Sequence, residues 1–196
     1  MMKIGILGGT FDPVHRVHLE LAHRALAQCH LDKVLFIPAG VPVRKQATAQ
    51  ASAQHRLNML RLACEGDPCF EVSSLEVDKP QVSYTIDTLR ELRAQLGASC
   101  ELYLILGEDA ALDIGTWKDS SEIAQLAKVV YARRPGGGAR EMVVPHGFEF
   151  FELQMPLQDV ASNSIRSLLD EGKDVSGLVP PEVLAYIKEQ GLYGQP

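Results

Sequence analysis

Short runs of apolar residues recur along the chain, and each run ends at glycine, proline or polar residues. Such runs are typical of buried parallel strands, which are covered on both faces. We expect strands at residues 4–7, 33–38, 70–73 with a continuation at 75–77, 101–106, 128–131 and, at an edge of the sheet, 146–153.

Between these runs, apolar residues recur at helical spacing, as in Leu19, Ala22, Leu26 and Cys29. Further helices are expected over residues 53–63, from Ser83 or Thr85 to about 96, after Gly107, from Ser162 or Asn163 to Gly172, and from Pro180 to Tyr193. The alternation of strands and helices predicts an α/β protein with a parallel sheet. We interpret residues 1–196 as a single domain whose part from about 160 to 196 is a short C-terminal helical extension.

The first nineteen residues carry the clearest chemistry. The strand at 4–7 ends in Gly8-Gly9, where the backbone can turn sharply and approach a ligand closely. Asp12 is the expected N-cap of the next helix and Pro13 its first residue. His15 and His18 then lie near the start of a helix, where free N–H groups and the helix dipole favour an anion.

Two common phosphate-binding loops do not match this stretch. The dinucleotide fingerprint G-x-G-x-x-G is missing, because the glycines fall at Gly5, Gly8 and Gly9, and the next strand ends at Pro38 without an acidic residue for a ribose. The phosphate loop G-x-x-x-x-G-K-[ST] is absent from the whole chain. Hydride transfer and P-loop ATPase chemistry are therefore disfavoured.

Other candidate ligand-binding residues follow later strands. Because parallel strands end at one edge of the sheet, Gly107 and Asp109 are expected in the same crevice as Gly8-Gly9-Thr10. Trp117 follows in a loop, where an indole can stack on a flat ring, although a lone tryptophan is more often part of a core.

Three arginines suit a phosphate. Arg133 and Arg134 follow the strand at 128–131, although a solvated turn is the simpler interpretation of such a pair. Arg166 lies near the start of a helix, where a cation opposes the helix dipole unless an anion lies beside it. By contrast, His55 and Arg56 at the start of the helix at 53–63 are expected to be structural.

The string G-G-T-F-D-P-V-H-x-x-H resembles the signature of nucleotidyltransferases that carry a His-x-Gly-His motif. The later strings S-Y-T-I-D-T-L, L-G-E-D with W-K, and I-R extend the resemblance over nearly the whole chain, specifically to the bacterial nicotinate-nucleotide adenylyltransferase family. The resemblance implies a Rossmann-like, doubly wound parallel sheet. It also implies transfer of an adenylyl group from ATP to nicotinate mononucleotide (NaMN), with release of pyrophosphate.

The resemblance also implies roles for particular residues. Catalysis would use His15, His18, Lys45 and Arg166, and ATP would contact Gly8, Gly9, Thr10, Phe11, His18, Ser162, Asn163, Ile165 and Arg166. NaMN would contact Lys45, Tyr84, Thr85, Gly107, Asp109, Trp117 and Arg134. Mg²⁺ would come with ATP and be bound mainly by its phosphates and water.

Three motif positions depart from the family pattern. Val17 stands for glycine, Arg44 for histidine and Asn163 for threonine. Two alternatives therefore stay open. One is a related adenylyltransferase that uses nicotinamide mononucleotide or another phosphorylated acceptor, and the other is a nucleotide-binding regulatory protein with weak catalysis.

Composition limits the partners, cellular location and cysteine chemistry that we expect. The chain of 196 residues is 46% hydrophobic and has a formal net charge of −6, so we expect no broad basic face and no nucleic-acid partner. It shows neither a signal peptide nor a membrane-spanning run, which favours a cytoplasmic protein. Its four cysteines lack C-x-x-C spacing, so we expect free thiols and no metal on protein ligands. A homo-oligomer is left open.

Overall fold

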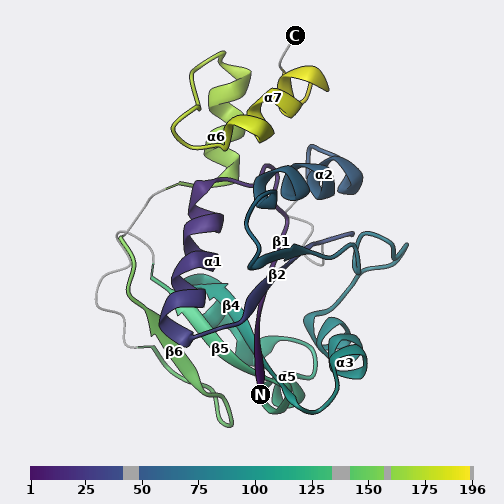
Figure 1. The fold of residues 1–196 in the computed structure, drawn as a ribbon, viewed down its shortest axis with the longest axis vertical. Coiled ribbons are helices and arrows are strands. Elements are labelled where there is room, and N and C mark those ends of the chain that lie inside the picture. The colour runs from purple at the N-terminus through teal and green to yellow at the C-terminus, as the bar shows by residue number, and fades with distance from the viewer. Residues whose placement is uncertain (42–48, 134–141, 157–159, 195–196) are drawn as a thin grey trace.

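The computed structural model describes residues 1–41, 49–133, 142–156 and 160–194, and its centre is a sheet of six parallel strands (Figure 1). The strand order is β3-β2-β1-β4-β5-β6. The strands are β1 (Met2–Gly9), β2 (Lys33–Pro38), β3 (Phe70–Val72), β4 (Cys100–Gly107), β5 (Ala127–Ala132) and β6 (Phe150–Leu153). This is the predicted Rossmann-like α/β fold.

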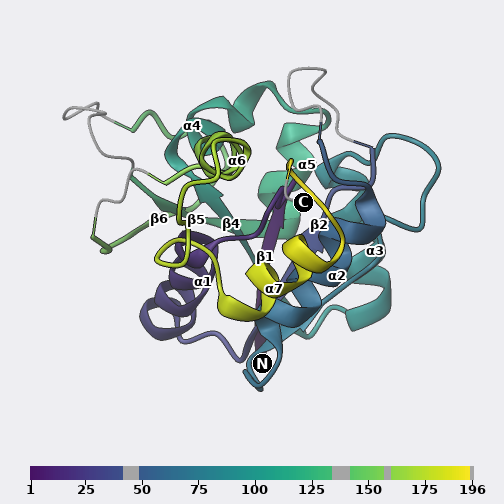
Figure 2. The same cartoon turned by 90° about the horizontal axis from the view of Figure 1, so that it is seen from above.

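Helices cover both faces of the sheet because alternate side chains of each strand point to opposite faces. In β1, Leu7 packs in a core with α1 (Arg16–Cys29) and α2 (Ala53–Cys64), whereas Ile6 packs in a second core with α3 (Thr85–Leu96) and α5 (Ser120–Leu126). Viewed from above, α1 and α2 lie on one side of the strands and α5 on the other (Figure 2). Short helices α4 (Glu108–Asp113) and η1 (Ile114–Thr116) connect β4 to α5.

The C-terminal helices lie over the carboxyl ends of the strands (Figure 1). These helices are α6 (Ser162–Asp170) and α7 (Pro181–Glu189). On α7, the Tyr186 hydroxyl lies 2.9 Å from Nδ1 of His55 and accepts from Nδ2 of Asn58 at 3.0 Å, which fixes α7 on α2. The C-terminal extension therefore covers the carboxyl ends of the strands, where the sequence predicts the site residues.

Several predicted boundaries were wrong for identifiable physical reasons. The first helix begins at Arg16 with His15 as its N-cap, because the Asp12 carboxylate is buried and accepts the backbone N–H groups of Gln50 and Ala51 instead of capping the helix. Residues 75–77 form a turn closed by the N–H of Asp78 donating to the carbonyl of Ser74, not a strand. The edge strand begins only at 150, after a turn in which the N–H of Phe148 donates to the carbonyl of Pro145.

The predicted caps of two later helices were also wrong. Tyr84 and Ala161 are the N-caps of α3 and α6, and neither makes a capping hydrogen bond with its side chain. The Ser162 hydroxyl donates to the carbonyl of Pro13 at 2.9 Å, so it joins α6 to the loop after β1. The Ser83 hydroxyl is buried and has no hydrogen-bond partner among the described residues.

A buried arginine, Arg56, binds three segments at the carboxyl ends of the strands: the loop after β1, the loop after β2 and the segment before α2. Arg56 is 1% exposed, and its guanidinium donates to the carbonyls of Ala51, Thr10, Ala39 and Gly40. Two of these bonds, to Thr10 and Ala39, measure 2.7 Å. The expectation that Arg56 is structural is confirmed, and its role is to hold the loops after β1 and β2 against α2.

Replacing Arg56 tests this clamp. We expect Arg56→Met to lower the free energy of unfolding by about 3 kcal/mol or more, because the carbonyls of the buried Ala51 and of three half-buried residues lose a charged donor at once. Denaturant unfolding measures the change. The exposed Arg61→Met on the same helix is the control and should stay within about 0.5 kcal/mol of the parent. A loss below about 1 kcal/mol for Arg56→Met would contradict the clamp.

Candidate functional site

The candidate site lies at the carboxyl ends of β1 and β4, where the strand order reverses. β1 pairs with β2 on one side and β4 on the other, so the connections leave the sheet in opposite directions and open a crevice between them. Two cavities meet there, and both are bordered by Gly8 and Leu106. We name them the histidine cavity, of about 490 Å³, and the tryptophan cavity, of about 180 Å³.

The histidine cavity lies between the loop after β1 and the start of α6. Its wall includes Gly8, Thr10, Phe11, Asp12, His15, Val17, His18, Gly107, Arg133, Ser162, Asn163 and Arg166. Most of the predicted ATP-binding residues therefore share one cavity. Among the three departures from the family pattern, Val17 and Asn163 both lie on this wall, and Arg44 lies outside the described residues.

The two histidines form one stacked unit at the start of α1. Their ring centroids are 3.7 Å apart with an interplanar angle of 25°, and the edge of Phe11 contacts the His18 ring at a centroid distance of 4.9 Å. The backbone N–H of His15 donates to Nδ1 of His18 at 3.2 Å. Since Nδ1 accepts, a neutral His18 carries its proton on Nε2, which leaves that N–H as a donor.

Burial determines the charge of this pair. Burial lowers the pKa of His15 to about 4, because the cation would lose its hydration. Burial also lowers the pKa of His18 well below its ordinary value, and the neighbouring His15 adds to the shift. Both rings are therefore neutral at pH 7. Nδ1 of His15 is buried and without a hydrogen-bond partner among the described residues.

Gly9 packs closely against Phe11 in the loop that carries this pair. A Cβ at Gly9 would lie 3.1 Å from Cζ of Phe11, so a side chain there would displace the ring that contacts His18. Phe11 itself has a φ of 52° and is 2% exposed. Packing against Phe11 thus accounts for Gly9 alone, since a Cβ at Gly8 would meet no atom nearer than the carbonyl oxygen of Ile37 at 4.0 Å.

Arg166 provides a cation on the α6 side of the histidine cavity. Its Nη1 donates to the backbone carbonyl of Asp12 at 2.7 Å and lies 3.5 Å from Oδ2 of the Asp12 carboxylate. Its Nε is buried and has no partner among the described residues. The guanidinium is therefore anchored at one nitrogen and retains donors for an anion.

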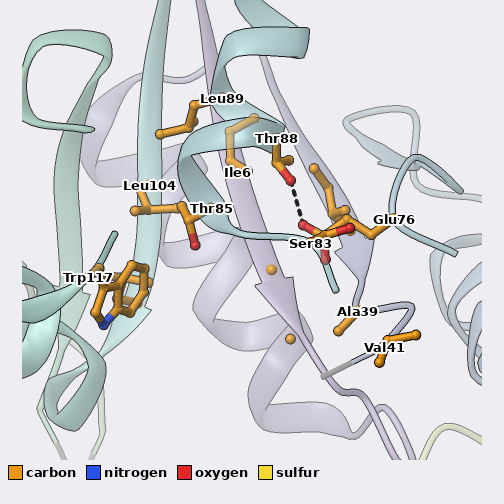
Figure 3. A pocket seen from close by; sticks show the side chains of 14 residues that line it. Ile6, Ala39, Val41, Glu76, Ser83, Thr85, Thr88, Leu89, Leu104 and Trp117 are labelled. Carbon is orange, nitrogen blue, oxygen red and sulfur yellow. Dashed lines mark hydrogen bonds between the residues drawn. The ribbon is translucent and has the colours of Figure 1, made fainter. Parts of the chain in front are cut away.

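The tryptophan cavity lies on the opposite face of the sheet from the histidine cavity, since Ile6 and Leu104 line it whereas Leu7 and Ile105 line the histidine cavity. Figure 3 shows Trp117 near Thr85 and Leu104, with Glu76, Ser83 and Val41 on the opposite side of β1. The Thr88 hydroxyl donates to Oε1 of Glu76 at 2.7 Å. Burial raises the pKa of Glu76, although this hydrogen bond and Lys79 oppose the shift. The cavity thus combines a flat aromatic wall with a small polar corner.

The structure separates some residues that the sequence analysis had grouped together. Thr85 and Trp117 line the tryptophan cavity, but Gly107 lines the histidine cavity. Tyr84 is 37% exposed with Nζ of Lys118 at 4.5 Å from its ring centroid, and Asp109 is exposed in the first turn of α4. Ile165 is buried in the core rather than in either cavity wall. The predicted site residues Lys45 and Arg134 lie outside the described residues.

Sequence reasoning missed polar groups whose position depends on distant parts of the chain. Glu76, Ser83 and Thr88 line the tryptophan cavity. Ser83 had been considered as a helix cap, and Ser83 and Thr88 also fall within the string S-Y-T-I-D-T-L, but neither had been given a role in binding. Arg133 lines the histidine cavity, where its Nε donates to Oε1 of Glu152 at 2.9 Å. Unlike the other three, Arg133 had been named with Arg134 as suited to a phosphate, from its position at a strand end.

Within residues 1–41, 49–133, 142–156 and 160–194, no three His, Cys, Asp or Glu side chains are grouped so that they could hold a metal. In the same ranges, no helix has the length and apolar character that crossing a membrane requires.

The sequence model of the cytidylyltransferase-like family matches residues 6–168 of the chain. A protein of Roseiflexus sp. strain RS-1 named probable nicotinate-nucleotide adenylyltransferase is 42% identical over 195 residues, which span 97% of each chain. One of the same name from Dehalococcoides mccartyi is 40% identical over 199 residues, covering 98% of this chain and 97% of the other.

Solved structures show the same architecture. The Plasmodium falciparum nicotinic acid mononucleotide adenylyltransferase complexed with NaAD superposes with a TM-score of 0.83, covering 100% of this chain and 99% of the other. The sequence identity of that pair is 19%, so the likeness supports the fold alone.

The buried His15 generates a prediction for the dependence of stability on pH. Between pH 6.5 and about 4 the unfolded chain binds a proton at His15 that the folded chain does not bind, so the free energy of unfolding rises with pH in this window. His15 alone should contribute up to about 3 kcal/mol of this change. We expect His15→Asn to flatten the dependence in urea titrations from pH 4 to 7.

The exposed His30, which follows the last residue of α1, provides the matched control. His30→Asn should keep the parental dependence on pH. An unchanged slope in His15→Asn would contradict a neutral, buried His15.

Proposed function

The chain belongs to the cytidylyltransferase-like family and, within it, to the nicotinate-nucleotide adenylyltransferases, and we propose that it transfers an adenylyl group from ATP to NaMN in NAD biosynthesis. The products are nicotinate adenine dinucleotide and pyrophosphate. The observation that carries the proposal is the pair of adjoining cavities at the switch point of the sheet, one with stacked histidines and an arginine, the other with a tryptophan. The proposal assigns ATP to the histidine cavity and NaMN to the tryptophan cavity.

The reaction needs alignment more than a protein nucleophile. A phosphate oxygen of NaMN attacks the α-phosphorus of ATP, and the bond from that phosphorus to the pyrophosphate oxygen breaks as the new bond forms. Both reactants are anions, so the site must align them and stabilise charge that spreads over the phosphate oxygens. Gly8 borders both cavities, so the reacting phosphates meet beside its backbone.

His15 and His18 are the proposed donors to the phosphates. Nε2–H of His18 is available because Nδ1 accepts the backbone N–H of His15. Nδ1 of His15 has no hydrogen-bond partner among the described residues. In the tautomer that carries its proton on Nδ1, His15 can therefore donate a hydrogen bond to a phosphate oxygen. An anion beside the His15 ring also favours its protonation, so phosphate binding strengthens the donor on His15.

Arg166 and Lys45 are the proposed partners of the triphosphate. Asp12 holds one nitrogen of Arg166, and the remaining donors suit the bidentate geometry of phosphate oxygens. The start of α6, with Ser162 and Asn163, adds a helix N-terminus to the same wall. Mg²⁺ would be bound by the phosphates of ATP and by water, where it neutralises developing charge.

Trp117 is the proposed platform for the pyridine ring of NaMN. Its indole forms one wall of the tryptophan cavity, and Thr85 lies beside it. Tyr84, Gly107, Asp109 and Arg134 remain predicted contacts of the same substrate. We propose a cytoplasmic location for this activity, with ATP and NaMN as the substrates and no nucleic acid.

One observation favours a related acceptor as the second candidate. The carboxyl of Glu76 lines the tryptophan cavity, and an ionised Glu76 would repel the carboxylate of NaMN but not the amide of nicotinamide mononucleotide. The raised pKa of Glu76 reduces this repulsion. Acceptor preference therefore has to be measured directly.

Pyrophosphate release with ATP and Mg²⁺ tests the function. Nicotinate mononucleotide, nicotinamide mononucleotide and phosphopantetheine are compared as acceptors, and we expect kcat/KM for the nicotinate form to exceed the others at least about tenfold. A preference for nicotinamide mononucleotide would favour the related enzyme. Background rates with all three, while ATP still binds, would contradict the proposal and support the regulatory alternative.

Two variants test, in the same assay, which cavity binds which substrate. Trp117→Ala should raise KM for NaMN about tenfold through lost stacking and leave KM for ATP nearly unchanged. His18→Ala should lower kcat about 100-fold, because a donor to the transition state is removed. The assignment is wrong if Trp117→Ala changes KM for ATP more than KM for NaMN.

A further inference from the structure

The last residues of the chain reach back into the candidate site. Gly191 has a φ of 59° and follows the end of α7, and the N–H of Leu192 donates to the carbonyl of Ile187 at 3.0 Å. This left-handed turn reverses the chain. Tyr193 is thereby buried to 6% exposure, and its hydroxyl donates to Oδ1 of Asp12 at 2.6 Å.

Asp12 is contacted by donors from three segments of the chain: the segment before α2, α6 and the end of the chain. Oδ1 accepts from the N–H of Ala51 at 3.1 Å in addition to the Tyr193 hydroxyl, and Oδ2 accepts from the N–H of Gln50 at 2.7 Å. Arg166 lies on the Oδ2 side at 3.5 Å and also donates to the Asp12 carbonyl. The carboxylate that anchors Arg166 is therefore held in place by the tyrosine hydroxyl on its other oxygen.

The hydroxyl of Tyr193 is suited to this task. Burial raises the pKa of Tyr193, and the bond to Asp12 raises it further, so the group stays a donor across the physiological range. The end of the chain also packs on α6, since a Cβ at Gly194 would lie 2.8 Å from Oδ1 of Asp170. Tyr193 lines neither cavity.

We propose that Tyr193 is a positioning residue for ATP: through Asp12 it sets the orientation of Arg166 on the wall of the histidine cavity. This inference rests on the proposed function, in which Arg166 binds the triphosphate. The C-terminal extension thus determines the affinity of the enzyme for one of its two substrates, in addition to covering α2.

The same extension provides a matched control. Tyr186 also uses its hydroxyl to reach a distant segment, but its partners are His55 and Asn58 on α2. None of these three residues lines either cavity. Tyr186→Phe and Tyr193→Phe each remove one hydroxyl, so a purely structural role would give both variants similar effects on ATP affinity.

The experiment measures the dissociation constant of MgATP by calorimetry for the parent and both variants, together with their melting temperatures. We expect Tyr193→Phe to weaken MgATP binding about tenfold, as when one hydrogen bond to a charged group is lost, and Tyr186→Phe to change it less than about twofold. In steady-state assays, KM for ATP should rise in Tyr193→Phe while KM for NaMN stays within about twofold.

A double-mutant cycle tests the route through Arg166. In an Arg166→Ala background, Tyr193→Phe should have no further effect on MgATP affinity. Equal MgATP affinity in the parent and Tyr193→Phe, or a full additional loss in the Arg166→Ala background, would overturn the inference and leave the function standing. Absence of MgATP binding by the parent protein would instead overturn the proposed function, and the inference with it.

Discussion

The buried carboxylate of Asp12 is the interaction on which the arrangement of the site depends. It is 2% exposed, so it must be surrounded by donors to remain charged inside the protein. Those donors come from the segment before α2, from α6 and from the end of the chain. One side chain thus fixes the relative positions of parts that are far apart in the sequence.

Arg56 plays the complementary role on the other side of the same loop. It donates to carbonyls after β1, after β2 and before α2, whereas Asp12 accepts N–H groups from the segment before α2. The loop that carries the histidines is therefore fixed by a buried cation and a buried anion. A site fixed in this way can hold two anionic substrates with little rearrangement, which is what an in-line displacement between phosphates requires.

The sequence was sufficient where the physical cause is local. The apolar runs predicted the strands of the sheet. The glycine turn with His15 and His18 predicted an anion site, and these two histidines line one cavity with Arg166. Trp117 was predicted at the ligand edge because strand ends meet there. These inferences need only periodicity, turn chemistry and the geometry of parallel sheets.

The sequence was insufficient where distant residues decide the outcome. Asp12 is a good helix cap by type, but Gln50 and Ala51 offer its carboxylate buried N–H groups, and the helix begins later as a result. Likewise, Ser162 bonds to the Pro13 carbonyl instead of capping its helix. The packing of β3 and α3 on the sheet brings Glu76 and Ser83 to the tryptophan cavity, and no local sequence pattern predicts this packing.

The most direct measurement compares the affinities of Asp12→Asn for ATP and for NaMN in the same folded sample. Asp12 lines the histidine cavity and not the tryptophan cavity, so the loss of its charge should disturb Arg166 and leave the NaMN site intact. We expect ATP affinity to fall at least about tenfold while NaMN affinity stays within about twofold. Unchanged ATP affinity, or an equal loss for both substrates, would contradict a role of Asp12 in holding Arg166 for ATP.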